Sequence, residues 1–405
     1  MFRSFVFKLL AIIIAAPFLL YFLWKFQIID LLLFPDSIKT WQIPDSSGAI
    51  AFSPNGEMLA TPSGPLIRRR LANNFGVQDH PYVEIRRVSD GSRAQTLDFF
   101  STRSLAFSPD NTLIAAGGLG GEINIWRISD GQRLHSLIGS NEPWSRTTVL
   151  AFTPDGQTLG AFAVYPTIEE TKLNQVSVWN VVNGKKRYIL TGKYTGAAIS
   201  PDGQLLALGS IDKPLMLYRL SDGTLLRQLE PTTTYSSHLN FSPDGKLLAY
   251  ISRGVGIPVY RMADGKQVHL LSPPTESFSG GEALSDIAIS PDGRYLAAAY
   301  YALSATDIFG PSIPLASHGR ISFWQLDNGQ KMQTLRGHKS GVYRLAFHPD
   351  GKLLASSGSD GIIRSWQVPP PIAPWPWLLL VSIMLIVLSY FGRSYFYKLR
   401  QKSNR

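Results

Sequence analysis

One short pattern recurs seven times along the middle of the chain. In each copy an apolar stretch leads into Ser, Thr or His, then Pro, then Asp or Asn and usually Gly, before a second apolar stretch. Successive prolines of the pattern are 42 to 58 residues apart, at positions 54, 109, 154, 201, 243, 291 and 349. Repeats of about 40 to 45 residues are typical of a propeller blade built from four β-strands. The pattern therefore predicts an all-β, seven-bladed β-propeller of four-stranded antiparallel blades.

Downstream of the proline, several copies carry an aromatic segment that ends in a tight turn. Trp126 comes before Asp130-Gly131, and Trp324 comes before an Asn-Gly pair at residue 328. Asp-Gly and Asn-Gly pairs between apolar segments are strong signals of a two-residue hairpin. The third and fourth strands of each blade are therefore expected to form such a hairpin.

The last copy resembles the WD40 repeat family. Gly337 and His338 precede its proline turn, and an Asp-Gly pair and a tryptophan follow it. The resemblance implies a hydrogen-bonded set of four structural residues, which falls on His338, Ser356, Asp360 and Trp366. The other copies lack the Gly-His pair and mostly the turn Asp, so most repeats are degenerate. The resemblance implies a fold and says little about activity.

The two ends of the repeat region predict how the ring closes. The last copy stops after its third strand, whereas residues 38–43 form an unassigned strand ahead of the first copy. Pairing of 38–43 with 362–367 would complete the seventh blade and leave no open interface in the ring. The propeller is therefore expected to span residues 36–370.

Two apolar runs flank the propeller and predict membrane helices. Residues 9–24 lack charge within an N-terminal anchor at 1–35, and residues 371–392 form a transmembrane helix before a basic tail at 393–405. A cleaved signal peptide is the alternative for the first run, but the residues at 21–26 are too bulky for a small-residue cleavage site. Two retained spans are the favoured interpretation.

The net charge of +10 is concentrated beside these runs, with an excess of two cations in residues 1–35 and five in the tail. Positive flanks remain in the cytoplasm, so both termini are expected there and the propeller outside, in a bacterial inner or comparable membrane. The inverted topology is the less favoured alternative. Because the charge follows the apolar runs, no nucleic-acid partner is expected.

The longest connections are predicted to lie on one face of the propeller. The chain enters on a fourth strand and leaves from a third strand, which turns the face of short turns toward the bilayer. The opposite, membrane-distal face receives the segments 62–81, 164–174, 272–285 and 301–318. Long insertions in repeat proteins commonly build binding surfaces. Candidate contacts are Arg68, Arg69 and Arg70, although a solvated run of charge is the simpler interpretation of these residues.

No catalytic constellation is recognisable in the sequence. Cysteine is absent, and the seven histidines lack metal-site spacing, so neither a metal nor a cofactor is predicted. The glycine run at 117–121 opens no expected helix and is interpreted as a turn.

These observations predict a membrane-tethered, non-enzymatic scaffold that binds a protein partner or assembles a membrane complex. No small-molecule substrate is identified. One alternative is an enzyme or ligand-binding propeller with a site in the central channel, and a weaker one is an anchor that acts through its two membrane spans.

Overall fold

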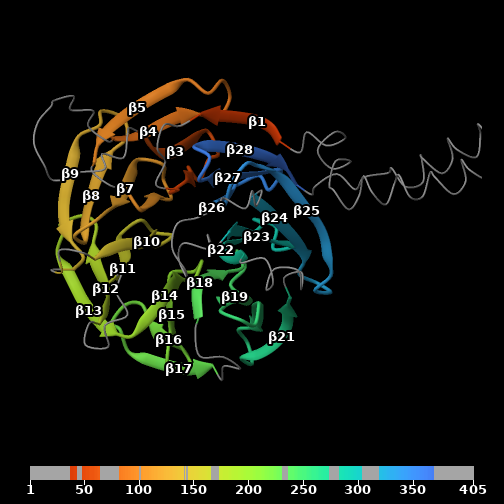
Figure 1. The fold of residues 1–405 in the computed structure, drawn as a ribbon. Helices are drawn as coiled ribbons and strands as arrows, with labels where there is room; N and C mark the ends of the chain where they lie inside the picture. Colours follow the sequence, from red (N-terminus) through yellow and green to blue (C-terminus); the bar gives the residue numbers. More distant parts are fainter. Residues whose placement is uncertain are drawn as a thin grey trace, which may run out of the picture. The chain divides into compact units, whose positions relative to one another are not determined.

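The computed structural model describes residues 37–42, 48–63, 82–99, 102–140, 142, 145–165, 173–229, 236–272, 282–302 and 319–368. Within these ranges, 28 strands form seven four-stranded antiparallel sheets arranged around a common centre (Figure 1). The predicted all-β, seven-bladed propeller is confirmed. The expected membrane segments 1–35 and 371–392 and the tail 393–405 lie outside the described residues. In the part that is described, no helix combines the length and the apolar character of a membrane span.

Each blade takes four strands in order from the centre of the ring to its rim. Blades one to three comprise β2 (Ala51–Phe52), β3 (Met58–Ser63), β4 (Tyr82–Arg87) and β5 (Arg93–Asp98); β6 (Ser104–Phe107), β7 (Leu113–Gly117), β8 (Glu122–Arg127) and β9 (Arg133–Ile138); and β10 (Arg146–Phe152), β11 (Thr158–Val164), β12 (Asn174–Asn180) and β13 (Lys186–Gly192).

Blades four to six continue the same order. They comprise β14 (Tyr194–Ile199), β15 (Leu205–Ser210), β16 (Leu215–Arg219) and β17 (Leu225–Leu229); β18 (Ser236–Phe241), β19 (Leu247–Ser252), β20 (Ile257–Arg261) and β21 (Lys266–Leu271); and β22 (Glu282–Ile289), β23 (Tyr295–Ala302), β24 (Gly319–Gln325) and β25 (Lys331–His338). Blade seven comprises β26 (Val342–Phe347), β27 (Leu353–Gly358), β28 (Ile362–Gln367) and β1 (Ser37–Gln42).

The seventh blade draws its strands from both ends of the repeat region. The outermost strand β1 lies beside β28 (Figure 1) and pairs with it antiparallel. Thr40 lies opposite Arg364 in this ladder. The sequence analysis placed this strand at 38–43, whereas the observed strand spans 37–42 and pairs with 362–367. The first described strand thus lies in the same sheet as the last, and the seventh blade has all four of its strands.

Burial along each blade follows from the packing of neighbouring blades face to face. The second strand is covered on both sides, so β11 is buried at six of its seven residues. The outer strand has one face toward solvent, and β17 is exposed at four of its five residues. Strands buried on both faces read as continuous apolar runs, whereas half-exposed strands do not.

Aromatic residues near the end of the third strands join each blade to the one before it. Trp126 of blade two packs against Val83 and Ile85 of blade one, and Trp366 of blade seven packs against Phe323 of blade six. Blade one has Arg86 at the corresponding position of β4. The described core between blades seven and one accordingly contains only three fully buried apolar side chains, those of Leu59, Ala355 and Ile363.

The recurring proline motif forms the turn between the first and second strands. In blades one to six the hydroxyl of its first residue accepts the N–H five residues onward at 2.8 to 3.0 Å, as Ser290 does from Tyr295. The residue two after the proline has a positive φ in all seven turns and is glycine in six. Asn111 takes that position in blade two with φ 60°, a conformation that Asn tolerates better than most residues. The repeated motif is therefore turn chemistry.

The closure of the ring can be tested with a disulfide, because the chain has no native cysteine. We expect the double variant Thr40→Cys, Arg364→Cys to form a disulfide on oxidation, since these residues are Cα partners in the β1–β28 ladder. The crosslink would close a loop of more than 300 residues and raise the unfolding free energy by up to about 5 kcal/mol. Denaturation with and without reductant measures the gain. The out-of-register pair Thr40→Cys, Ile363→Cys is the control, and equal crosslinking of both pairs would contradict the register.

Candidate functional site

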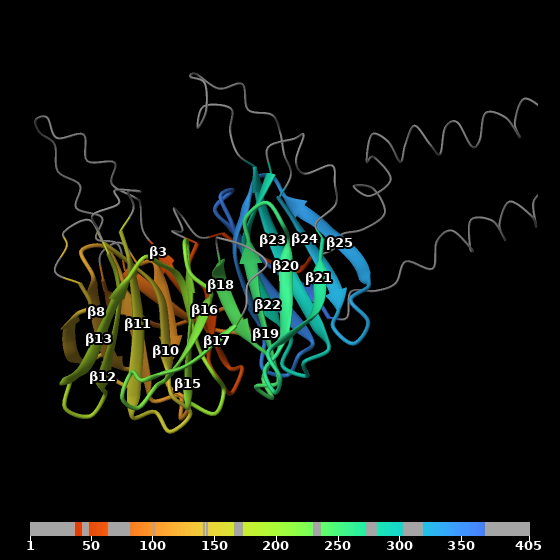
Figure 2. The same cartoon turned by 90° about the horizontal axis from the view of Figure 1, so that it is seen from below.

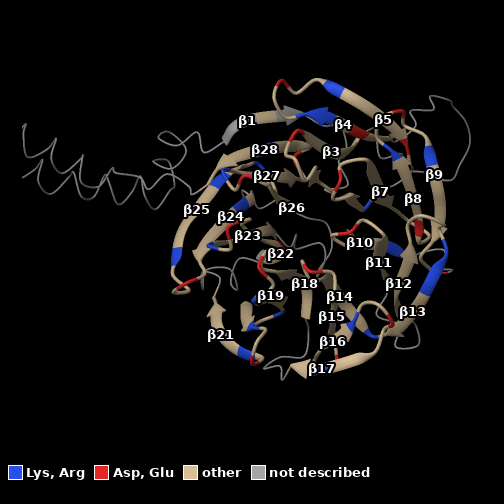
Figure 3. Ribbon diagram, turned by 180° about the vertical axis from the view of Figure 1, so that it is seen from behind, with Lys and Arg blue, Asp and Glu red and all other residues tan. Residues whose placement is uncertain are grey.

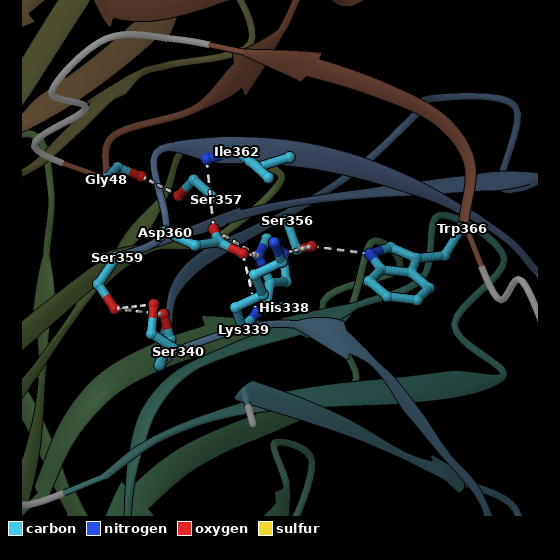
Figure 4. Close-up of polar contacts among 11 residues, drawn as sticks. Gly48, His338, Lys339, Ser340, Ser356, Ser357, Ser359, Asp360, Ile362 and Trp366 are labelled. Atoms are coloured by element: carbon cyan, nitrogen blue, oxygen red, sulfur yellow. Dashed lines mark hydrogen bonds and ion pairs between the residues drawn. The ribbon is translucent and has the colours of Figure 1, made fainter. Parts of the chain in front are cut away.

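The four residues expected to form a hydrogen-bonded set lie together between blades six and seven (Figure 4). His338 Nδ1 is 3.0 Å from Asp360 Oδ1, and His338 Nε2 is 2.7 Å from Ser356 Oγ. The indole Nε1 of Trp366 donates to the same Ser356 Oγ at 2.7 Å. All of these bonds are satisfied at once when Nδ1 of the imidazole donates to Asp360 and Nε2 accepts from the Ser356 hydroxyl.

The environment of this set is that of a structural brace. His338 and Ser356 are fully buried, and Trp366 is 1% exposed. Burial alone would raise the pKa of the Asp360 carboxyl, but its contact with His338 and the N–H groups of Lys339 and Ile362 bring that pKa below its ordinary value. A side chain at Gly358 would collide with the imidazole and with Asp360. The set is closed to a ligand and links β25, β27 and β28.

The three arginines named as candidate contacts, Arg68, Arg69 and Arg70, lie outside the described residues. The strands that flank them, β3 and β4, are adjacent and antiparallel, so the segment 64–81 joins two strand ends on one face of blade one. The strand ends that flank 166–172, 273–281 and 303–318 lie on this same face, and the proline turns lie on the other (Figure 2). We name the face that carries these strand ends the long-connection face.

The innermost strands share a distortion near the long-connection face. Their pairing with the second strand shifts register in blades three to seven, at Thr147/Val149, Tyr194/Gly196, Ser237/Asn240, Leu284/Asp286 and Val342/Arg344. In blade two, the Arg103 N–H donates to Gly117 O at 2.7 Å, although Ser104 is the Cα partner of Gly117. Bulges of this kind redirect side chains and are frequent beside functional sites.

His238, Asp286 and Arg344 stand at three of these register shifts, and Arg103 and Arg146 lie close to the corresponding points of blades two and three. We name them the central cluster, which consists of Arg103, Arg146, His238, Asp286 and Arg344. Each belongs to an innermost strand or directly precedes one, and the five come from blades two, three, five, six and seven. Among the described residues, no group of three or more His, Asp or Glu side chains has the geometry of a metal site.

Contacts within the central cluster cross between blades. Arg344 Nη1 of blade seven is 3.1 Å from His238 Nε2 of blade five, so the contact passes the inner edge of blade six. Because a guanidinium only donates, His238 Nε2 accepts and its imidazole is neutral. Asp286 Oδ2 accepts the N–H of Leu345 at 2.8 Å, which joins blade six to blade seven.

Partial removal from water and neighbouring charges shift several pKa values in the central cluster. Burial, and then the charge of Arg344, lower the pKa of His238 to about 3. Burial raises the pKa of Asp286 to about 6, against the opposing effects of Arg344 and of two backbone N–H groups. Burial and the charges of Arg146 and Arg344 lower the pKa of Arg103. Arg146 and Arg344 are therefore both close enough to Arg103 to disfavour its charge.

Sequence reasoning did not single out the central cluster. Its members are scattered over more than 240 residues and follow no motif of their own. The signal that would have found them is their position relative to the repeat, because His238, Asp286 and Arg344 each stand five residues before the motif proline. Aligning the seven copies on that proline places all three at one level of the ring.

Comparison with known proteins identifies the repeat. Two segments, residues 96–127 and 329–367, match the family model described as WD domain, G-beta repeat. The chain is 35% identical over 92 residues to "Protein LST8 homolog" of Drosophila melanogaster, covering 21% of this chain and 24% of that protein. The chain spans only 4% to 24% of the length of the curated relatives that it matches. The chain thus carries WD40 repeats.

Solved structures share the whole propeller fold. The β-propeller domain of Cps50 (Swd1) from Myceliophteria thermophila superposes with a TM-score of 0.64 at 15% identity, over 82% of this chain and 99% of that one. A chain of the Mitotic Checkpoint Complex gives a TM-score of 0.62 at 16% identity, over 82% of this chain and 91% of that one. At these identities the likeness concerns the fold.

Removing the hydroxyl at the centre of the brace tests its role in stability. We expect Ser356→Ala to lower the unfolding free energy by about 3 kcal/mol, because it leaves the Trp366 indole N–H and His338 Nε2 buried without their partner. Urea denaturation of the full-length protein measures the loss. Ser359→Ala, which removes an exposed hydroxyl bonded to Ser340, is the matched control. Similar losses for both variants would argue against the brace.

The lowered pKa of the His238 imidazole predicts a pH dependence of stability. The unfolded chain takes up a proton on His238 near pH 6.5, whereas the folded protein does so near pH 3. The stability contributed by the neutral imidazole is therefore complete above pH 6.5 and is lost progressively as the pH falls toward 3. The variant His238→Asn, which suits the φ of 50° at this position, removes that titration.

We expect the urea midpoint of the unmodified protein to fall more steeply between pH 6.5 and 4 than that of the variant. Parallel pH curves for the two proteins would refute the assignment.

Proposed function

We propose that this WD40-repeat propeller is a membrane-tethered, non-enzymatic scaffold that binds a protein partner through its long-connection face. The observation that carries the proposal is that the strand ends flanking the four longest connecting segments of the propeller lie on a single face of the ring (Figure 2). A rigid ring fixes the strand ends on this face before a partner arrives, which reduces the entropy lost on binding. The fold shared with a chain of the Mitotic Checkpoint Complex supports an assembly role.

The membrane tether in this proposal is supported by the sequence beside the propeller. Apolar runs in residues 1–35 and 371–392 are long enough for spans, and the cations of 393–405 favour a cytoplasmic C-terminus. Two spans place both termini on the cytoplasmic side and the propeller on the opposite side. The adjacent strands β1 and β28 bring the two chain ends to one place in the ring, which suits a pair of neighbouring anchors.

A second candidate function, ligand binding at the ring centre, is favoured by one observation. The central cluster gathers three guanidiniums, a carboxylate and an imidazole from five blades. Such convergence of charged groups at one point is common in binding sites. The central cluster lies near the long-connection face, so a ligand bound to it would lie beside the surface that we propose for the protein partner.

Site-specific photocrosslinking in native membranes tests the scaffold proposal. A benzoylphenylalanine at position 69 probes the long-connection face, and one at position 244 probes an exposed proline turn on the opposite face. We expect the full-length protein to remain in carbonate-washed membranes. We also expect a discrete adduct from position 69 that is absent from position 244, because a partner on one face reaches only the first probe.

The two readouts of this experiment fail separately. Release of the protein by carbonate would remove the membrane tether from the proposal and leave the binding face untouched. Equal adducts from both positions, or none from position 69 and from further probes in 303–318, would contradict partner binding on the long-connection face.

A further inference from the structure

The central cluster carries more positive than negative charge. Arg103, Arg146 and Arg344 contribute three guanidiniums, His238 is neutral, and Asp286 supplies one carboxylate. Charges of both signs are interspersed around the outer part of the ring (Figure 3). Like charges held at close range disfavour one another, and a site lined mainly by one sign of charge attracts ligands of the opposite sign.

The hydrogen bonding of Arg103 is incomplete within the described residues. Its Nε is buried and has no hydrogen-bond partner among them. The described side chains whose charges act on it are Arg146, Arg344 and Tyr343, and none of these is a carboxylate. A buried donor without an acceptor in the protein is free to donate to water or to a bound anion.

The cluster is open to solvent on the long-connection face. Arg146 is exposed, and the neighbouring Tyr343 keeps 41% of its surface accessible. Arg103 and Arg344 are partly exposed, in contrast to the sealed brace around His338. An incoming anion can therefore reach the guanidiniums without unfolding a blade.

Distortions of the innermost strands lie beside Arg344 and Arg103. Arg344 follows the register shift of β26, and Arg103 donates its N–H to the carbonyl of a residue already paired with Ser104. Extra residues at these points turn the strand and re-aim its side chains. The guanidinium fork accepts no hydrogen bond and matches a carboxylate in a bidentate manner.

We propose that the three arginines of the central cluster bind carboxylates of an acidic segment of a protein partner. A protein segment is preferred to a free small anion because several cations from different blades suit a ligand with several carboxylates. The choice of a protein segment as the ligand rests on the proposed function. The carboxylate of Asp286, which accepts the N–H of Leu345, repels an anion that approaches from blade six.

Binding of a labelled hexaglutamate peptide to the detergent-solubilised full-length protein tests this inference. We expect saturable binding that weakens with added salt, and a loss of affinity of about tenfold for Arg103→Gln and for Arg344→Gln. Arg133→Gln is the matched control, because it removes the same charge from an exposed position on the outer strand β9. Inorganic phosphate and a hexalysine peptide are the comparison probes.

A stability measurement separates binding from a structural role. Relief of repulsion should leave the thermal midpoint of Arg103→Gln unchanged or raise it, as is common where charge is held for function. A lowered midpoint with unchanged peptide affinity would mean that the cluster is structural, and the inference would fail. Equal weakening by Arg133→Gln, or tighter binding of phosphate than of peptide, would also overturn it.

The inference and the proposed function can fail independently. Absence of peptide binding together with an adduct from position 69 would rule out the acidic-segment inference and leave the scaffold proposal standing. Peptide binding without any adduct from the long-connection face would keep the anion site and remove the proposed partner surface.

Discussion

Pairing between β1 and β28 is the constraint on which the rest of the ring depends. Six of the blades are contiguous in sequence, and only the seventh joins strands that are more than 300 residues apart. The described apolar core at the adjoining interface between blades seven and one is small, with Leu59, Ala355 and Ile363 as its buried members. Polar contacts reinforce this interface, since Ser357 Oγ donates to Gly48 O at 2.5 Å and His348 Nε2 is 2.9 Å from Gly56 O.

Hydrogen bonds from hydroxyls to carbonyls connect the innermost strands elsewhere in the ring. Ser104 Oγ donates to Thr147 O at 3.0 Å, and Ser285 Oγ donates to Val342 O at 2.6 Å. Such bonds satisfy carbonyls that the bulges release from regular pairing. The same bulges turn charged side chains toward one another, so the local distortion that requires these bonds also creates the central cluster. Structure and candidate binding chemistry therefore arise from one feature of the first strands.

The sequence predicts the repeated parts of this fold better than its centre. Proline turns recur with a hydroxyl before them, and the requirement for a positive φ explains both the glycines and Asn111. The unassigned strand near residue 40 pointed to closure because a blade lacked its fourth strand. The central cluster escaped prediction because bulges interrupt the alternation that tells which side of a strand a residue faces. Contacts such as Arg344 with His238 depend on three-dimensional closure, which no local pattern encodes.

The position of Trp366 has a mechanical consequence. Trp366 lies opposite Ser37, the first residue of β1. The residue pair at the open end of the β1–β28 ladder thus includes Trp366, whose indole N–H donates to Ser356. A force that pulls the start of β1 away from the end of β28 would act on the Ser37–Trp366 pair first and would then break the hydrogen bonds between the two strands one after another. The brace around His338 holds β28 against that load. Resistance of the closed ring to tension is thereby concentrated in the blade whose repeat is the least degenerate.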